Sequence, residues 1–232
     1  MPPAENMGAR MAARHLRRSF PSLTGMFRAL GELRDIRPSE LAVPEAVTRI
    51  VIGQMLSRKA ARGIASRVAA AGSRRHERHP WELSAAELRK CGLSRRKART
   101  IGEFAVAYAL APERFDRWQY LDYPGLLAEV RRLWGMSDWT ACMLAIFHFG
   151  NPDVWPVSDG SIVRAASLVS ECLLSGQVLE ADLAAPYRSY LALYLWRSLD
   201  TGFWANGQAK AAVSLRRGTG DAVDRQLAME RP

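Results

Sequence analysis

A carboxylate at the end of an apolar segment is the clearest candidate for chemistry in this sequence. Residues 133–159 read LWGMSDWTACMLAIFHFGNPDVWPVSD, where a Gly135-Met136-Ser137 turn precedes an apolar stretch and Asp159 follows a Gly/Asn/Pro loop. A turn of this kind between two helices exposes backbone N–H groups, which bind an anion without a charged side chain. Two plainer interpretations stay open: an ordinary αα-hairpin, and an aspartate that only caps the next helix.

Basic side chains gather near the starts of two predicted helices. No acid occurs between Ala46 and His76, and the whole chain carries a formal net charge of +10. Clustered Lys and Arg in a chain this basic favour contacts with the phosphates of a nucleic acid, although a solvated helix face is the plainer explanation of either cluster alone. The candidates for such contacts are Arg58, Lys59, Arg96 and Lys97.

The elements that must position these residues are helices. Apolar residues recur at helical spacing from Leu23 onward, while no alternating run of β-branched residues bounded by turns predicts a strand. The fold class expected is therefore all-α, with neither a Rossmann nor a P-loop glycine pattern. Residues 1–20 are expected to be a mobile basic lead-in, and residues 205–232 a polar tail.

Cysteine usage and hydropathy restrict the class of protein further. Cys91, Cys142 and Cys172 are odd in number and widely spaced, so we expect no disulfide framework, no structural zinc and no iron–sulfur cluster. No run of 18 apolar residues and no hydrophobic signal core occur. We therefore expect a soluble intracellular protein, cytoplasmic or nucleoid-associated, without a membrane partner or a cofactor.

Several segments, in this order, resemble one enzyme family. GQMLSRKAA, CGLSRRKAR, LWGMSDWTA, PDVWPVSD and PYRSYLALYLWRSLD are similar to the helix-hairpin-helix-GPD DNA glycosylases, in particular the 3-methyladenine DNA glycosylase II branch. The resemblance spans roughly residues 23–204. It implies two helical subdomains flanking a cleft over about residues 21–204, with the helix-hairpin-helix at about 124–150. It also implies a monomer that binds double-stranded DNA containing a damaged base.

The same resemblance assigns roles to individual residues. Asp159 matches the catalytic acid, and Trp139 stands where lyase-active relatives carry the lysine that attacks the sugar, which implies base removal without strand cleavage. The implied base pocket comprises Trp139, Met143 and Trp196, although both tryptophans also suit a protein core. The segment implied to enter the duplex is Gln54, Met55 and Leu56. The implied phosphate contacts of the hairpin are Gly135, Met136, Ser137 and Thr140.

The hairpin departs from the family pattern. Where a second glycine is usual the chain has Ser137, which restricts the backbone, and Asp138 adds negative charge beside a phosphate site. Both changes would weaken the grip on DNA, and on the monovalent cation that some relatives hold at this hairpin; no other metal site is expected. Two alternatives stay open, a glycosylase for uracil, hypoxanthine or another deaminated base and a catalytically weak DNA-binding relative. A helical protein–protein scaffold explains neither the basic clusters nor the motif order.

Overall fold

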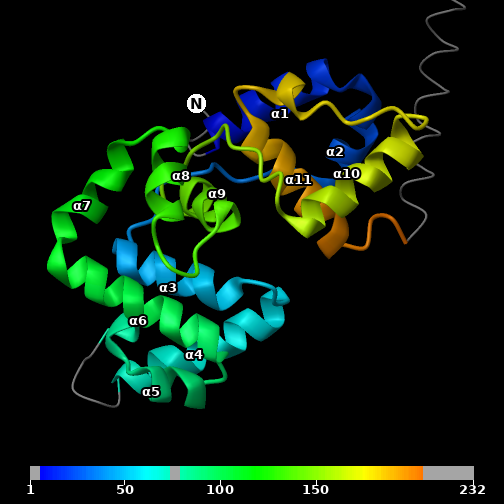
Figure 1. The fold of residues 1–232 in the computed structure, drawn as a ribbon. Coiled ribbons are helices and arrows are strands. Elements are labelled where there is room, and N and C mark those ends of the chain that lie inside the picture. The colour runs from blue at the N-terminus through cyan, green and yellow to red at the C-terminus, as the bar shows by residue number, and fades with distance from the viewer. Residues whose placement is uncertain (1–5, 74–78, 206–232) are drawn as a thin grey trace, which may run out of the picture. The chain divides into compact units, whose positions relative to one another are not determined.

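The protein is built from helices alone in the part that can be described. The computed structural model describes residues 6–73 and 79–205, which form eleven α-helices and four short 3-10 helices and contain no strand (Figure 1). The all-α prediction is confirmed. The helices divide into two compact units, one made of Met1–Ile36 with Pro152–Pro232 and the other of Arg37–Asn151. We call them unit 1 and unit 2.

Unit 1 packs the beginning of the chain against its last helices. Its elements are α1 (Met7–Ser19), η1 (Pro21–Leu23), α2 (Thr24–Leu30), α10 (Gly160–Leu173), η4 (Ala181–Ala184) and α11 (Arg188–Asp200). Helix α11 is the centre of this unit, because it contacts α10, α1, α2 and η4 (Figure 1, orange). Its Leu191, Ala192 and Leu195 are fully buried, so this helix, which carries Trp196, is held by packing on several sides.

The expectation of a mobile lead-in over residues 1–20 is wrong for most of that segment. Met7–Ser19 form α1, in which Ala12 and Leu16 are fully buried in the core of unit 1. Alanines and one leucine at three- and four-residue spacing make a narrow apolar stripe, and the many arginines on the other faces hide it in the sequence. The polar tail expected from 205 on lies, beyond Ala205, outside the described residues.

Unit 2 contains the hairpin and the basic helices. Its elements are α3 (Val43–Gly53), α4 (Arg58–Ser73), η2 (Pro80–Glu82), α5 (Ala85–Lys90), α6 (Arg95–Leu110), α7 (Pro112–Asp116), η3 (Arg117–Tyr120), α8 (Tyr123–Arg131) and α9 (Asp138–Phe147). Helix α9 is buried from Thr140 through Ile146, as its lack of a polar face predicts. Helix α3 packs against both α6 and α9, which brings the end of α3 to the start of α9.

Side-chain caps define where several helices begin. Asp122 accepts a hydrogen bond from the N–H of Gly125 at the start of α8, and Ser94 accepts one from Lys97 at the start of α6. These two caps fix both the first arm of the hairpin and the basic end of α6.

In residues 6–73 and 79–205 no helix is both long and apolar enough to cross a membrane. None of the three cysteines forms a disulfide within the described residues.

Candidate active site

Asp159 lies at the start of α10 with its carboxylate held from two directions. Its Oδ1 accepts a hydrogen bond from the backbone N–H of Ile162 at 2.9 Å and another from the indole Nε1–H of Trp196 at 3.1 Å. The residue is 9% exposed. The helix cap and the catalytic candidate are thus the same carboxylate, since the cap fixes its orientation and Trp196 adds a second donor. The structure brings two predicted site residues, Asp159 and Trp196, together within unit 1.

The loop that leads to Asp159 is tied to α11 by an ion pair. Arg188 donates from Nε to Asp153 Oδ1 at 2.8 Å and from Nη2 to Oδ2 at 2.9 Å, and its backbone N–H also reaches Oδ1 at 3.1 Å. Next along α11, Ser189 Oγ accepts from the N–H of Val154 at 2.9 Å and donates to its carbonyl at 3.2 Å. Because α11 also carries Trp196, one helix positions both the loop and a donor to the acid. These residues are not identifiable as site residues from the sequence, where an acid in the loop and an arginine next to a helix start are the only signals.

The Arg188–Asp153 pair makes a pH-dependent contribution to stability that a mutation isolates. Burial raises the pKa of Asp153, but hydrogen bonds from Arg188 outweigh it and hold the pKa below its ordinary value. The stabilisation that this ion pair contributes is therefore complete above the ordinary pKa of an aspartate. It is lost as the pH falls through the lowered pKa of Asp153 in the folded protein. We expect Arg188→Met to lower the free energy of unfolding by about 1–2 kcal/mol at neutral pH, and by less at acid pH. Urea unfolding at pH 7 and pH 3 measures this, and Arg164→Met, an exposed arginine on α10, is the control. An equal effect at both pH values would contradict this role.

The hairpin between α8 and α9 depends on one glycine. Gly135 has φ +76°, a conformation that side chains disfavour, and a Cβ atom there would overlap the hydroxyl of Thr100 and lie 3.1 Å from Thr100 Cβ. Thr100 is itself fixed, since its hydroxyl donates to the carbonyl of Arg96 at 3.0 Å. Beside the turn, the guanidinium of Arg99 lies 4.1 Å from the ring centre of Trp134. A glycine is therefore required at position 135 for two reasons: the positive φ disfavours other residues, and Thr100 leaves no room for a side chain.

The two departures in the hairpin leave its backbone intact. Ser137 has φ −141° and ψ 175°, an extended conformation open to any residue, so the expected restriction by serine at this position is wrong. The carboxylate of Asp138 receives two hydrogen bonds from Arg131, at 2.7 and 2.6 Å. The hydrogen bonds from Arg131 hold the pKa of Asp138 below its ordinary value. The negative charge that appeared unfavourable for a phosphate is thus balanced within the hairpin.

The turn after α3 presents two apolar side chains to solvent, and Met55 is the more exposed of them. Met55 has φ +55° and is 100% exposed, whereas Leu56 is 39% exposed. Gln54 turns the other way, because its Nε2 donates to the hydroxyl of Thr140 at 3.2 Å. A non-glycine residue in the left-handed region with a fully exposed apolar side chain is an unusual and strained arrangement. Of the three residues predicted to enter the duplex, Met55 is the one that projects.

Two predicted phosphate ligands have structural roles instead. Thr140 is fully buried, and its hydroxyl accepts hydrogen bonds from Gln54 and from the N–H of Ser137 at 3.3 Å, so it joins the α3 turn to the hairpin. Lys97 donates from Nζ to the carbonyl of Ile52 at 2.9 Å and to that of Gln54. The partly buried ammonium therefore caps the end of α3. Lys59 and Arg96 are exposed, while the side chain of Arg58 lies outside what the structure describes.

Removing the Lys97 ammonium is expected to loosen the α3 turn. Lys97→Met keeps the aliphatic stem but removes two charge-assisted hydrogen bonds, so we expect the free energy of unfolding to fall by about 2 kcal/mol. Urea unfolding measures this. Lys90→Met, at an exposed position of α5, is the matched control and should have no effect. If the two variants were equally stable, the hydrogen bonds of Lys97 would not support the turn.

The remaining pocket candidates lie on α9. Trp139 is half-buried and Met143 is 6% exposed, and both belong to unit 2, as do the hairpin and the α3 turn. Asp159 and Trp196 belong to unit 1. Within the described residues no group of three or more His, Cys, Asp or Glu side chains is arranged to hold a metal ion.

Comparison with known proteins places this geometry in context. No family model matches the chain. Among solved structures it is similar to the Schizosaccharomyces pombe 3-methyladenine DNA glycosylase Mag1 in complex with abasic DNA, with TM-score 0.66 and 23% identity over 81% of this chain and 96% of that one. It is also similar to the DNA-3-methyladenine glycosidase of Bacillus halodurans, with TM-score 0.62 and 23% identity over 84% and 94%.

Curated sequences agree with the structures. The chain is 30% identical over 172 residues to a probable bifunctional transcriptional activator/DNA repair enzyme AlkA of Mycobacterium tuberculosis, covering 70% of this chain and 35% of that protein. It is 25% identical over 169 residues to the alkylbase DNA glycosidase-like protein mag2 of Schizosaccharomyces pombe, covering 68% and 78%. The chain is similar in sequence to these DNA repair proteins and has the helical fold of the solved 3-methyladenine DNA glycosylases. The resemblance inferred from the motifs is confirmed. The chain spans about a third of the length of the Mycobacterium relative.

Proposed function

We propose that the chain is a monofunctional DNA glycosylase that removes alkylated purines such as 3-methyladenine from double-stranded DNA. The observation that carries this proposal is the Asp159 carboxylate, oriented by the Ile162 N–H and the Trp196 indole within a fold shared with 3-methyladenine DNA glycosylases. The net charge of +10 supports a polyanionic partner. Relatives named for 3-methyladenine or alkylbase removal favour this substrate class over a deaminated base.

The carboxylate suits the charge that develops when the N-glycosidic bond breaks. The bonding electrons leave with the base, which neutralises the positive charge of an alkylated purine, while positive charge grows on the sugar. A fixed carboxylate near C1′ stabilises that charge and orients the water whose oxygen bonds to C1′ and whose proton passes to solvent. A cationic base needs little acid catalysis, and it is attracted to aromatic faces such as those of Trp139 and Trp196. Strand cleavage needs an amine nucleophile, and at the matching position this chain has the indole of Trp139, which supports base removal alone.

Met55 is our candidate for the side chain that enters the duplex. Chemistry on a stacked base requires that the nucleotide be flipped out, at a cost of a few kcal/mol, and an inserted apolar side chain fills the space that it leaves. Met55 is fully exposed on a strained turn that Lys97 and Gln54 hold in place. An inserting role would account for this strained and fully exposed conformation, which no packing contact explains.

Replacing Met55 by glycine separates stability from activity. Met55→Gly relieves the positive φ and is expected to raise the free energy of unfolding by about 1 kcal/mol. The same change removes the inserted side chain, so base release from duplex DNA should fall about tenfold or more, while release from single-stranded DNA should change little. Ser175→Gly, at φ +54° in unit 1, is the matched control: it should gain stability and keep full activity. Unchanged duplex activity of Met55→Gly would exclude an inserting role.

A panel of damaged duplexes tests the proposed reaction. The purified chain is incubated with DNA containing 3-methyladenine, 7-methylguanine, uracil, hypoxanthine or 8-oxoguanine, and the released bases and the strand lengths are measured. We expect release of the alkylated purines with the strand left intact until alkali is added. Release of uracil alone would contradict the alkylation proposal, and strand cleavage without alkali would contradict a monofunctional enzyme.

A further inference from the structure

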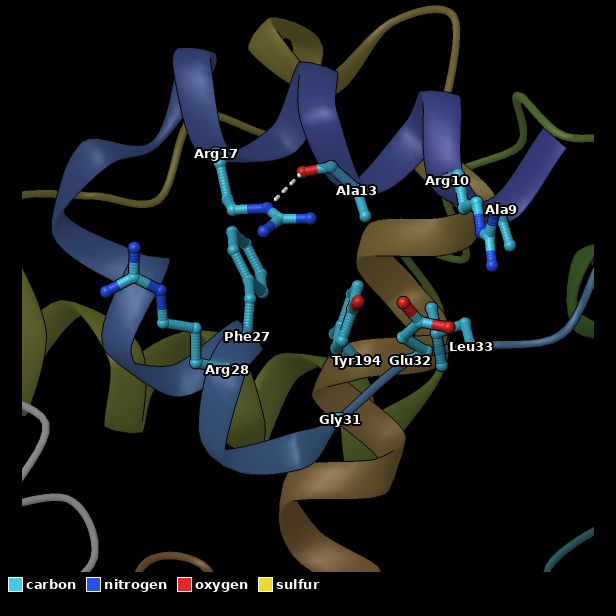
Figure 2. A pocket seen from close by; sticks show the side chains of 10 residues that line it. All are labelled: Ala9, Arg10, Ala13, Arg17, Phe27, Arg28, Gly31, Glu32, Leu33 and Tyr194. Carbon is cyan, nitrogen blue, oxygen red and sulfur yellow. Dashed lines mark hydrogen bonds between the residues drawn. The ribbon is translucent and has the colours of Figure 1, made fainter. Parts of the chain in front are cut away.

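Unit 1 contains a cavity that does not include the candidate catalytic residues. Its volume is about 200 Å³, and it lies among α1, α2, the Gly31–Leu33 segment and α11 (Figure 2). Neither Asp159 nor Trp196 lines it. Its walls combine aromatic rings with several charged side chains, and this combination is typical of a site for a small organic ion.

Two buried aromatic rings form the apolar part of the cavity. Phe27 and Tyr194 are 3% and 2% exposed, and their ring centres lie 4.8 Å apart with planes tilted by 48°. The hydroxyl of Tyr194 makes no hydrogen bond to any residue that the structure describes. By contrast, the hydroxyl of Tyr190, one turn earlier on α11, accepts from the N–H of Ile36 at 3.1 Å. This hydroxyl is not among the fully buried polar atoms without a partner, so it is accessible from the cavity and can donate to a ligand there.

Burial raises the pKa of Tyr194, and the nearby Glu32 raises it further against the opposing effects of Arg17 and Arg197. The hydroxyl is therefore protonated at neutral pH and is available as a donor to an acceptor in the cavity.

Three arginines line the cavity against one acid. Arg10, Arg17 and Arg28 come from α1 and α2, and Glu32 is the only acid among the lining residues. The Nε of Arg17 donates to the carbonyl of Ala13 at 2.9 Å, which directs its guanidinium toward Phe27 (Figure 2). A guanidinium fixed in this way keeps its terminal N–H groups available, and these match the geometry of a phosphate or carboxylate.

The walls of the cavity are held rigidly by hydrogen bonds from outside it. Arg197 on α11 donates to the carbonyls of Leu30 at 3.0 Å and Glu32 at 2.8 Å, so the Gly31–Leu33 wall is fixed to α11. Asp35 accepts from the N–H of Ala9 at 2.7 Å, which fixes the start of α1 to the chain that follows this wall. A cavity whose walls are already ordered binds a ligand at a lower entropic cost.

We propose that this cavity binds a small organic anion with a planar ring, of the size and chemistry of a nucleoside monophosphate. The ring enters beside the edges of Phe27 and Tyr194 that reach the cavity, and the phosphate pairs with the guanidinium of Arg17. The cavity is smaller than a typical drug-sized pocket, so the ring system occupies the enclosed part and the phosphate stays at the arginine-lined edge. The site is separate from Asp159, and ligand binding does not require glycosylase activity.

Calorimetric titration of the full chain with AMP, adenosine and inorganic phosphate tests this site. We expect saturable AMP binding at one site, with adenosine and phosphate each at least about tenfold weaker because each lacks one half of the ligand. Arg17→Gln should weaken AMP binding about tenfold, and Tyr194→Phe, which removes only the free hydroxyl, about fivefold. Arg18→Gln, on the same helix but outside the cavity lining, is the matched control and should bind AMP as the wild type does.

Three outcomes would overturn the proposal. The first is that AMP does not saturate the protein at about 1 mM, the weak end of specific affinity. The second is that AMP and inorganic phosphate bind with equal affinity. The third is that either Arg17→Gln or Tyr194→Phe binds AMP as tightly as the wild type does. Each of these readouts is independent of base release, so none depends on the proposed enzymatic activity.

Discussion

Asp159→Asn is expected to lower the single-turnover rate of base release from duplex DNA by at least about 100-fold, the usual effect of removing one electrostatic contribution to a transition state. The physical reason is that asparagine keeps the shape of the side chain and loses its negative charge. The Oδ1 atom that receives the hydrogen bonds of Ile162 and Trp196 stays in place. The loss should therefore appear in the chemical step and not in DNA affinity, which a filter-binding or anisotropy measurement reports separately.

The helix-cap interpretation of Asp159 makes a different prediction for the same variant. Asparagine caps helices about as well as aspartate, so the free energy of unfolding of Asp159→Asn should stay within about 0.5 kcal/mol of the wild type. Asp122→Asn is the matched control, because Asp122 also caps a helix, accepting from the N–H of Gly125 at 2.9 Å. It should release base at the wild-type rate. If both variants were fully active, Asp159 would be a helix cap and nothing more.

Gly135→Ala is expected to destabilise unit 2 strongly. The added methyl group meets the Thr100 hydroxyl, which cannot move away because it is bonded to the carbonyl of Arg96. Steric overlap costs about 1–3 kcal/mol and the positive φ adds about 1–2 kcal/mol. Urea unfolding should therefore show a loss of about 3 kcal/mol, accompanied by weaker DNA binding because the hairpin turn shifts.

Gly102→Ala is the matched control for this substitution. Gly102 lies within α6, without a positive φ and with no atom within 4 Å of an added Cβ. Alanine is a better helix former than glycine, so this variant should gain about 0.5–1 kcal/mol. A similar stability of the two variants would mean that the Gly135 turn is able to relax around a side chain.

Much of the fold is readable in the sequence because its signals are local. Apolar spacing predicts the buried helix α9, and the caps at Ser94, Asp122 and Asp159 stand where the helices begin. The candidate acid and the tryptophan of α11 followed from the order of the motifs, and the structure adds that the two are hydrogen-bonded. Helix α1 was missed because its apolar stripe consists mainly of alanines among many arginines.

Contacts between distant residues explain the other differences. A lysine in a basic cluster is indistinguishable by sequence from a phosphate ligand, yet Lys97 reaches carbonyls more than 40 residues earlier in the chain. Thr140 was expected to face DNA, but the packing of α3 against α9 buries it under Gln54. The conformation of Ser137 likewise depends on the turn around it, and this extended backbone does not require a glycine.

Base release from one substrate tests the central claim most directly. Duplex DNA methylated to contain 3-methyladenine is incubated with the purified chain in excess, and the free base is identified by mass spectrometry. The proposal predicts intact 3-methyladenine in solution and an equal amount of alkali-labile abasic sites in the DNA. Binding of this DNA without release of any base would contradict the proposal and would support a DNA-binding relative that lacks catalysis.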